Sequence, residues 1–503
     1  MNDAPPQSTL TDALPSRIPG IHWPAVVGVR DAAVLALLFQ MECTQWLSAE
    51  ALRKQQNRQL GALLKHARCH CAFYRERLPN DLARWYEIPL LTRADLQTQA
   101  DGIRAAAYPR AHGKTFDIAT GGSTAEPVTV RRTALTQLFW QAATLRDHLW
   151  HRRDFSATMA IIRQFPQPVD TTKPKRWGGV LRSGPAWHLP ISTDVEAQSR
   201  WLQGVDPDIL LTYPANLDAL LTRMRHEGVT LPRLREVRTV SGTVTAALRE
   251  RCQHALGVPL TDLYSAQEVG VIALQCPESG LLHVQSEHLL VEVLDEQGQP
   301  CREGEIGQVV VTDLHNFAMP LIRYALRDWA EVGPPCSCGR GLTTLRRVVG
   351  RTRNMAVSPA GKHFWPVLET QRMLEVLPHL RQYQFEQTAI DAITVTLACT
   401  PAPTVEKLLR LQTVLEQALG HAYRSCLSMD MAIPGNTHSV WCQWEVRGVR
   451  VSDCRAWRGR LAHLVVQISN GADMISTEVK KEGLWICEFP GFAGAGAYSR
   501  VGR

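Results

Sequence analysis

The spacing of apolar residues predicts a helical start to the chain. Between about residues 30 and 75, apolar side chains recur every three or four positions, for example at Leu35 and Leu38. This spacing matches one face of an α-helix, so we expect helix over most of the stretch. Residues 88–96 then show a short extended pattern that leads into another helix, with Thr92 in the N-cap position.

Between about residues 115 and 275 the pattern changes to short apolar runs that alternate with helical segments. Residues 157–162 and 209–213 have the continuous apolar character of buried strands, whereas 217–225 and 244–255 have helical spacing. Strands that alternate with helices in this way favour a mostly parallel sheet with helices packed on it.

A strand-rich stretch follows. Residues 289–295 and 306–312 alternate as strands do and flank a turn at 296–300, which predicts a β-hairpin. After residue 351, strand patterns resume together with one helical segment at 405–419. The sheet is therefore expected to continue into a β-rich subdomain, and a small α+β region is expected after it.

Length and pattern together predict an α/β protein of more than one domain. A chain of 503 residues is too long for one small hydrophobic core. We expect a large N-terminal multi-layer α/β body with the β-rich subdomain over residues 1–353, a small α+β C-terminal domain over 354–450, and an atypical tail over 451–503. The end of that tail, near residues 491–500, shows no periodicity.

Composition narrows the class of protein. Hydrophobic residues make up 45% and charged residues 20%, as in soluble globular proteins, and we find no apolar run of about 18 residues that would span a membrane. The first residues do not resemble a secretory signal. Thirteen cysteines lack the density of a disulfide scaffold, which favours reduced thiols in a cytoplasmic protein. The net charge of +7 is spread along the chain, so a small anionic ligand is favoured over nucleic acid.

A glycine-rich stretch is suited to binding phosphate. It consists of Thr120, Gly121, Gly122, Ser123 and Thr124. Glycines let backbone N–H groups approach phosphate oxygens closely, and the hydroxyl groups add further donors. By itself such a stretch is more often an ordinary turn, and it does not match the G-x-x-x-x-G-K-[ST] phosphate loop.

Two carboxylates further along the chain are candidate binding residues. Glu268 ends the run Tyr-Ser-Ala-Gln-Glu at residues 264–268 and offers the hard oxygen ligand that Mg²⁺ prefers. Asp328 can accept hydrogen bonds from both hydroxyls of a ribose. The ordinary alternatives are an exposed strand-end carboxylate for Glu268 and a salt bridge between Asp328 and Arg323.

In this order, over about 230 residues, these stretches resemble the adenylate-forming enzymes that activate carboxylic acids with ATP. The closest resemblance is to the phenylacetate–coenzyme A ligase family. It implies that residues 120–124 surround the β- and γ-phosphates, that Tyr264 borders adenine, and that Arg351 faces the ribose or a phosphate. Catalytic roles are implied for Thr124, Glu268 and Arg351; nucleotide-binding roles are implied for Thr120, Gly121, Gly122, Ser123, Tyr264, Ser265, Arg323 and Asp328.

Several positions depart from the family pattern. Ala125 and Glu126 stand where the family often has Gly and Lys, and Gly242 lacks the Glu that usually follows it. Asn354 stands where an Asp usually forms the hinge to the small domain, which is a mild change because Asn tolerates similar backbone angles.

The lysine that relatives carry near the end of the small domain is also missing. No lysine occurs between Lys407 and Lys480. Lys480 or Lys481 can replace it, adenylation can be impaired, or a reading-frame change after about residue 434 can have altered the sequence. Loss of that cation would leave developing negative charge unsupported.

Four residues in the strand-rich section are candidate zinc ligands: Cys276, His283, Cys336 and Cys338. Three thiolates and an imidazole suit tetrahedral zinc, and some relatives carry a similar set. The alternative is free thiols in loops beside an unrelated histidine. Phe139 and Trp140, on the helix after the glycine-rich stretch, are candidate walls of an acid pocket or ordinary core residues.

The predicted activity is an AMP-forming acid–thiol ligase that uses ATP, Mg²⁺ and coenzyme A. It would activate an aryl or arylacetic acid as an acyl-adenylate and form the thioester with coenzyme A. One alternative transfers the acyl group to a carrier protein or an amine. Another is a nucleotide-binding relative that no longer catalyses.

Overall fold

The computed structural model describes residues 13–21, 24–79, 82–119, 128–165 and 167–351, and shorter segments between 355 and 488. The chain divides into two compact units, Met1–Arg353 and Asn354–Arg503. None of the helices in the described residues is both long and apolar enough to cross a membrane.

The predicted N-terminal helical stretch is two long helices, α2 (Val29–Thr44) and α3 (Ala49–His70), and not one. The break falls before Ser48, whose hydroxyl accepts a hydrogen bond from the backbone N–H of Ala51 at 3.2 Å and caps α3. Gly341 also packs against the break, where its N–H bonds the carbonyl of Gln45 at 2.8 Å. The periodicity continues across this break, so spacing alone did not reveal it.

Short helices connect α3 to the sheet: η1 (Ala72–Tyr74), η2 (Leu82–Glu87), α4 (Arg93–Thr98), α5 (Ala100–Ile103) and η3 (Arg110–His112). The predicted N-cap at Thr92 is confirmed, because Thr92 and Asp95 form a reciprocal capping box at the start of α4.

The rest of the first unit alternates strands and helices before it becomes strand-rich. Its helices are α6 (Ala134–Trp150), α7 (Val195–Val205), α8 (Pro214–Glu227) and α9 (Ala246–Leu256). Its strands are β1 (Thr115–Ala119), β2 (Thr129–Thr133), β3 (Met159–Arg163), β4 (Lys175–Arg176), β5 (Pro185–Pro190), β6 (Ile209–Thr212), β7 (Glu236–Val240), β8 (Leu260–Ala266), β9 (Gly270–Gln275), β10 (Leu282–Val284), β11 (Leu289–Leu294), β12 (Ile306–Asp313), β13 (Tyr324–Val332) and β14 (Thr344–Arg351).

Twelve of these strands form one mixed sheet in the order β11-β12-β13-β14-β10-β9-β8-β7-β6-β3-β5-β4. The run from β5 to β8 is parallel, as the alternating pattern predicted. From β8 to β11 every pairing is antiparallel, and the predicted hairpin is confirmed as β11 and β12. The parallel half therefore ends at β8.

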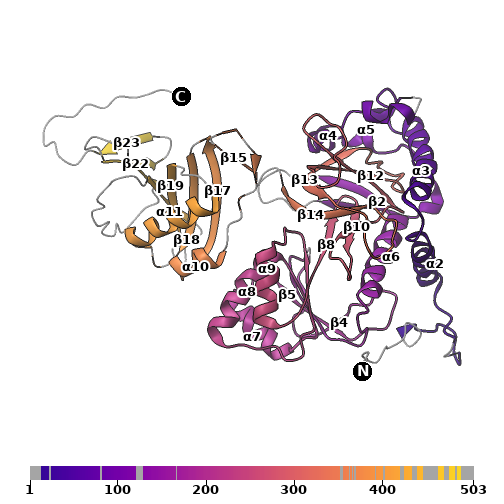
Figure 1. Ribbon diagram of the computed structural model, residues 1–503, viewed down its shortest axis with the longest axis horizontal. Helices are drawn as coiled ribbons and strands as arrows, with labels where there is room; N and C mark the ends of the chain where they lie inside the picture. Colours follow the sequence, from indigo (N-terminus) through magenta and orange to yellow (C-terminus); the bar gives the residue numbers. More distant parts are fainter. Residues whose placement is uncertain are drawn as a thin grey trace. The chain divides into compact units, whose positions relative to one another are not determined.

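Helices cover both faces of the parallel half. In Figure 1, α7, α8 and α9 lie together on one side of it, and α6, backed by α2, lies on the other. Leucines of α8 such as Leu217 and Leu221 pack with Leu210 of β6 and Val237 of β7 in one apolar cluster. On the opposite face Ala142 and Trp150 of α6 pack with residues of α2, with Leu263 of β8 and with the neighbouring strand β9. The α/β class predicted from the sequence is confirmed.

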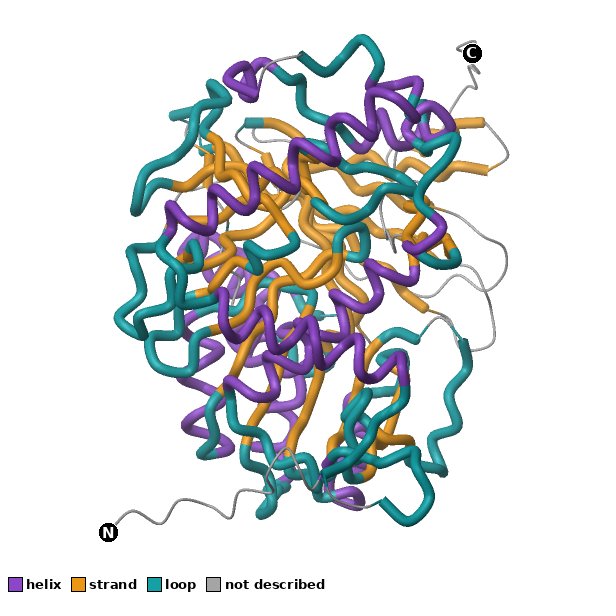
Figure 2. Tube along the Cα trace, turned by 90° about the vertical axis from the view of Figure 1, so that its right-hand side faces the viewer, coloured by secondary structure: helices purple, strands orange, loops and turns teal. Residues whose placement is uncertain are grey.

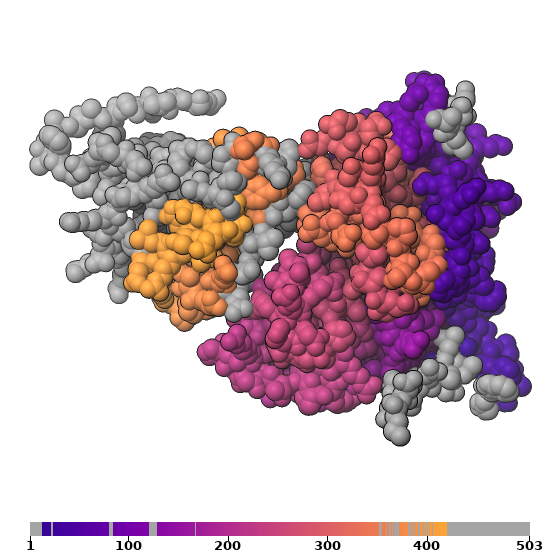
Figure 3. Space-filling view, viewed as in Figure 1, coloured from indigo at the N-terminus to yellow at the C-terminus, as the bar shows by residue number. Residues whose placement is uncertain are grey.

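The antiparallel half is covered by α3. Figure 2, seen from the side of α2 and α3, shows helices lying across the strands, and in Figure 3 the indigo surface of these helices adjoins the orange surface of the strand-rich part. Leu60, Leu63 and Leu64 of α3 belong to the largest apolar cluster, and the side chain of Gln56 donates to the carbonyls of Ser286 and Leu289. These polar contacts fix α3 on the sheet.

The second unit contains a seven-stranded sheet in the order β17-β18-β19-β20-β21-β22-β23. Its elements are β15 (Ala356–Val357), β16 (His363–Phe364), α10 (Thr370–Val376), β17 (Leu380–Ala389), β18 (Ala392–Cys399), α11 (Val405–Leu419), β19 (Arg424–Ala432), β20 (Ser439–Glu445), β21 (His463–Ile468), β22 (Ile475–Lys481) and β23 (Leu484–Glu488). The helix predicted at 405–419 is confirmed, and its Leu411 and Leu415 pack on Val395 and Leu397 of β18. The strands continue past residue 450, while the boundaries predicted at 354 and 450 stay predictions.

Candidate nucleotide site

The glycine-rich stretch at 120–127, with Thr120, Gly121, Gly122, Ser123 and Thr124, lies outside the described residues. Its flanks are described, since β1 and β2 pair antiparallel with Ala119 opposite Thr129. The chain therefore enters and leaves this stretch at neighbouring positions of one hairpin. Asn354, the predicted hinge, also lies outside the described residues.

Tyr264, Asp328 and Arg351 meet in one cluster, although β8 and β13 are separated by three other strands in the sheet. The Tyr264 hydroxyl donates to Asp328 Oδ2 at 2.9 Å, and Arg351 Nε lies 3.0 Å from Asp328 Oδ1. Four strand spacings in a flat sheet amount to about 19 Å, so the sheet must fold over to allow this contact. The intervening β10 has only three residues, which leaves room for the fold.

The cluster has a buried side and an exposed side, so a ligand can reach it from solvent. The side chains of Tyr264 and Asp328 are buried, whereas half of the Arg351 side chain is exposed. Burial raises the pKa of Tyr264 well above its ordinary value, and the neighbouring Asp328 carboxylate raises that pKa further. Tyr264 thus stays a neutral donor, and Asp328 is a carboxylate held between a donor and a cation.

Glu268 lies in the turn between β8 and β9, next to this cluster. It accepts a hydrogen bond from the Tyr324 hydroxyl at 3.4 Å. Burial raises the pKa of Glu268; Arg351 and Arg93 lower that pKa and Asp328 raises it, so the four charges lie close together. The partly buried Glu268 carboxylate offers the kind of oxygen ligand that Mg²⁺ prefers.

Arg323 has other partners than the sequence suggested. Its buried guanidinium pairs with Glu292 at 3.2 Å and donates to the carbonyls of Tyr86 and Ile88. The sequence analysis considered a salt bridge between Asp328 and Arg323. In the structure Asp328 instead pairs with Arg351, which lies opposite it on the neighbouring strand β14. We therefore leave Arg323 out of the nucleotide site, because its hydrogen bonds hold the segment before α4 against the sheet.

Ser265 follows Tyr264 on β8, is half-buried and pairs with Val271 across the β8–β9 hairpin. Gly270 begins β9 with a φ of +94°, and a Cβ there would lie 3.4 Å from the guanidinium of Arg132 on β2. This close approach places Arg132, which lies near the end of β2 away from residues 120–127, beside the start of β9, two residues after Glu268.

The four predicted zinc ligands converge. Their ligand atoms all lie within 4.8 Å of one another, with Cys336 Sγ 3.8 Å from Cys276 Sγ and Cys338 Sγ 3.3 Å from His283 Nε2. Sulfur atoms on tetrahedral zinc with 2.3 Å bonds lie about 3.8 Å apart, so this geometry fits the metal. Burial lowers the pKa of His283 to about 4, which keeps its imidazole neutral as a ligand must be.

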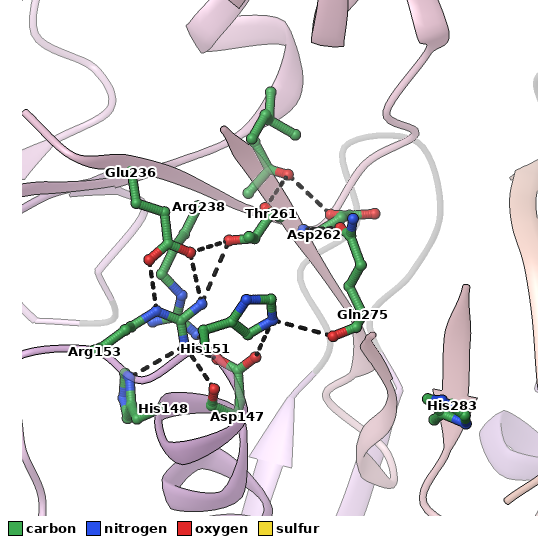
Figure 4. A network of polar contacts seen from close by, with 12 residues as sticks. Asp147, His148, His151, Arg153, Glu236, Arg238, Thr261, Asp262, Gln275 and His283 are labelled. Atoms are coloured by element: carbon green, nitrogen blue, oxygen red, sulfur yellow. Dashed lines mark hydrogen bonds and ion pairs between the residues drawn. The ribbon is translucent and has the colours of Figure 1, made fainter. Parts of the chain in front are cut away.

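A buried ionic network, which the sequence did not reveal, supports β7 and β8 (Figure 4). Arg153 forms ion pairs with Glu236 of β7 at 2.7 Å and with Asp147 of α6 at 2.6 Å, and Arg238 also contacts Asp147. Burial alone would raise the pKa of Asp147, but Arg153 and Arg238 outweigh it and hold that pKa below its ordinary value. The network fixes α6 to the strands whose ends carry the site.

Replacement of Arg153 by methionine is expected to lower the free energy of unfolding by about 3–5 kcal/mol, because the carboxylates of Asp147 and Glu236 would stay buried without their partner. Chemical denaturation of the two proteins measures this. Arg235→Met is the control, since that side chain is 65% exposed and its ion pairs, at 3.7 and 3.9 Å, are worth about 1 kcal/mol or less. Equal losses in both variants would contradict a special role for the network.

Solved structures of a CoA ligase have a similar fold. 2-Hydroxyisobutyryl-CoA ligase in the postadenylation state, in complex with R3-HIB-AMP, superposes with a TM-score of 0.56 at 17% identity, over 80% of this chain and 89% of that one. The complex of that enzyme with 2-HIB-AMP gives the same values. These likenesses define the fold.

In sequence the chain is similar to phenylacetate–coenzyme A ligases. It is 31% identical over 202 residues to that of Thermus thermophilus, which is 38% of this chain and 45% of the relative. It is 24% identical over 257 residues to that of Aromatoleum evansii (49% and 57%) and 23% identical over 393 residues to that of Pseudomonas putida (72% and 84%). The chain thus spans about half the length of the first two, and no protein-family model matches it. The resemblance indicated by the motifs is confirmed.

Proposed function

We propose that the protein is an AMP-forming acid–thiol ligase. It activates a carboxylic acid, of the aryl or arylacetic class, with ATP and transfers the acyl group to coenzyme A. The observation that carries this proposal is the contact of Tyr264, Asp328 and Arg351 beside Glu268. Three sequence motifs far apart in the chain supply these side chains. The similarity to phenylacetate–coenzyme A ligases supports the choice of reaction and of acid.

In the proposed reaction a carboxylate oxygen of the acid attacks the α-phosphorus of ATP and pyrophosphate leaves. The thiol sulfur of coenzyme A then attacks the carbonyl carbon of the acyl-adenylate and AMP leaves. Asp328 accepts hydrogen bonds from the ribose hydroxyls, and the exposed end of Arg351 supports the ribose or a phosphate. Tyr264 holds Asp328 in place and borders the adenine.

Residues 120–124 would bind the β- and γ-phosphates, with Thr124 as a catalytic donor. Glu268 would hold Mg²⁺, which neutralises phosphate oxygens when bound. The nearby Tyr324 hydroxyl orients the Glu268 carboxylate. Cys276, His283, Cys336 and Cys338 would hold a structural Zn²⁺. Lys480 and Lys481 lie on β22 opposite Trp485 and Leu484, and they are the candidates to replace the missing lysine.

Exchange of labelled pyrophosphate into ATP, measured with a panel of aryl and arylacetic acids, tests the activation step. We expect exchange that depends on one of these acids, and AMP and an acyl thioester after addition of coenzyme A. Exchange without turnover on coenzyme A would point to a carrier protein or an amine as the acceptor. Binding of ATP without exchange for any acid would show a nucleotide-binding relative and refute the proposed activity.

Replacement of Glu268 by glutamine is expected to reduce pyrophosphate exchange about 100-fold or more, because a neutral amide is a poor ligand for Mg²⁺. Since the pKa of Glu268 is raised, the native enzyme should also lose activity at a higher pH on acidification than an ordinary carboxylate would cause. Exchange rates against pH and Mg²⁺ concentration measure both effects. The control is Glu296→Gln, in the exposed β11–β12 turn, and an unchanged Mg²⁺ dependence in the Glu268 variant would contradict the role.

A further inference from the structure

A small cavity of about 10 Å³ lies beside the proposed nucleotide site, and the proposed reaction assigns it no role. Val269, the residue after Glu268, lines one side of it, and Phe139 of α6 lines another. Arg132, His288, Asp313 and His315 supply polar groups to its wall. The cavity therefore adjoins both the Glu268 turn and the helix that follows the glycine-rich stretch.

Arg132 brings a hydrogen-bond donor to this cavity. Only 1% of the residue is exposed. Its Nε donates to the Thr136 hydroxyl and its Nη2 to the Thr136 carbonyl, both at 3.3 Å, and its guanidinium lies 5.1 Å from the ring centre of Trp140. Within the described part of the chain its buried Nη1 has no hydrogen-bond partner. Buried polar groups in folded proteins are nearly always paired, so this nitrogen points to a bound group.

His288 brings an acceptor. Its Nε2 lies 3.0 Å from the carbonyl of Val271, and a carbonyl can only accept, so Nε2 carries the proton. Burial lowers the pKa of His288 to about 4 and keeps the ring neutral. Its buried Nδ1 is then a bare lone pair without a partner among the described residues. Asp313 adds a second acceptor, and its buried carboxylate interacts electrostatically with Arg132.

The polar groups of the cavity wall determine which substituent of a bound acid would fit there. A carboxylate would pair with Arg132 but give His288 Nδ1 no donor, and an ammonium group would pair with Asp313 and His288 Nδ1 but give Arg132 Nη1 no acceptor. An apolar group would leave Arg132 Nη1 and His288 Nδ1 unpaired. A hydroxyl group can accept from the first and donate to the second, and its single oxygen fits a cavity of this size. Phe139, which stacks on His315 at 4.2 Å, supplies an aromatic wall.

We propose that this cavity is the polar end of the acid pocket and that it takes a hydroxyl group, so that the substrate is a hydroxylated aromatic acid. The inference rests on the proposed acid activation. It makes Arg132 and His288 specificity-determining residues. Under this proposal Phe139 forms a wall of the acid pocket.

Pyrophosphate exchange with phenylacetate, benzoate and their 2-, 3- and 4-hydroxy derivatives tests the inference. We expect the native protein to prefer one hydroxylated acid over its unsubstituted parent by at least about 100-fold in kcat/KM, because a site built to bond a hydroxyl strongly rejects the analogue without it. A preference for the unsubstituted acid, or equal use of both, would overturn the inference while leaving the proposed activity intact. No exchange with any acid would instead overturn the proposed activity.

The variant Arg132→Met separates a specificity role from a structural one. It should reduce kcat/KM for the hydroxylated acid by about 30-fold or more and change that for the unsubstituted parent by about threefold or less. Arg131→Met is the matched control, because that neighbouring arginine pairs with the exposed Asp117 and should leave the preference unchanged. Equal losses for both acids in Arg132→Met would show a structural role only. If that variant does not fold, the preference of the native protein decides the question.

Discussion

Replacement of Asp328 by alanine is expected to weaken ATP binding by about 100-fold or more. Asp328 is proposed to accept hydrogen bonds from both ribose hydroxyls, and a hydrogen bond to a charged group contributes about 1.5–3 kcal/mol. Two such bonds correspond to at least two powers of ten in Kd. Calorimetric titration with ATP, on protein shown to be folded by circular dichroism, measures the effect.

Asp328 also holds Tyr264 and Arg351, so the variant needs controls. Tyr264→Phe removes only the 2.9 Å hydrogen bond to Asp328 and leaves the carboxylate in place, and it should weaken binding about tenfold or less. Asp101→Ala changes an almost fully exposed carboxylate and should have no effect. An unchanged affinity for ATP in folded Asp328→Ala would refute the ribose role.

The features that the sequence predicted well are those determined by neighbouring residues. The N-cap predicted at Thr92 depends only on the residues that follow it, and the structure adds the reciprocal hydrogen bond from Asp95 one helical turn away. The β11–β12 hairpin and α11 follow from local periodicity and turn residues, and the structure has both where the pattern placed them. The alternation of strands and helices also gave the parallel half of the sheet, because each crossover is itself a local unit.

The features that the sequence did not predict depend on partners far away in the chain. Arg323 pairs with Glu292, and nothing near Arg323 in sequence distinguishes that partner from Asp328. The network around Arg153 joins residues more than 80 positions apart, and the residues that line the cavity at Arg132 come from β2, α6, β9, β12 and the loops beside these strands. Charged residues are usually exposed, so single arginines and histidines gave no signal of burial.

The nucleotide site lies between these extremes. Motif resemblance named Tyr264, Glu268, Asp328 and Arg351 without reference to space, and the structure brings these four together. It also adds Arg93 and Tyr324, which act on Glu268 and which the motifs did not single out for that carboxylate. In the sequence these two residues only stand next to Thr92 and Arg323. Their interaction with Glu268 could be found only from the structure.

Removal of the proposed zinc ion is expected to lower both the stability of the protein and its affinity for ATP. Cys276 follows β9, His283 lies on β10, and Cys336 and Cys338 lie between β13 and β14, so a bound metal would join three segments of the antiparallel half. The hairpin β8–β9 and the strands β13 and β14 carry the residues of the proposed nucleotide site. Metal–ligand bonds contribute about 10–16 kcal/mol in small zinc peptides, and part of that should be lost here.

We therefore expect purified protein to contain about one equivalent of zinc, and Cys336→Ser to lose it and to lower the Tm by about 10 °C. Affinity for ATP should fall in the same variant, because β13 and β14 would no longer be held at the end opposite Asp328 and Arg351. The exposed thiol of Cys43 provides the control, since Cys43→Ser should keep both metal and Tm. Metal analysis that finds less than one equivalent, unchanged in Cys336→Ser and Cys338→Ser, would end the zinc assignment.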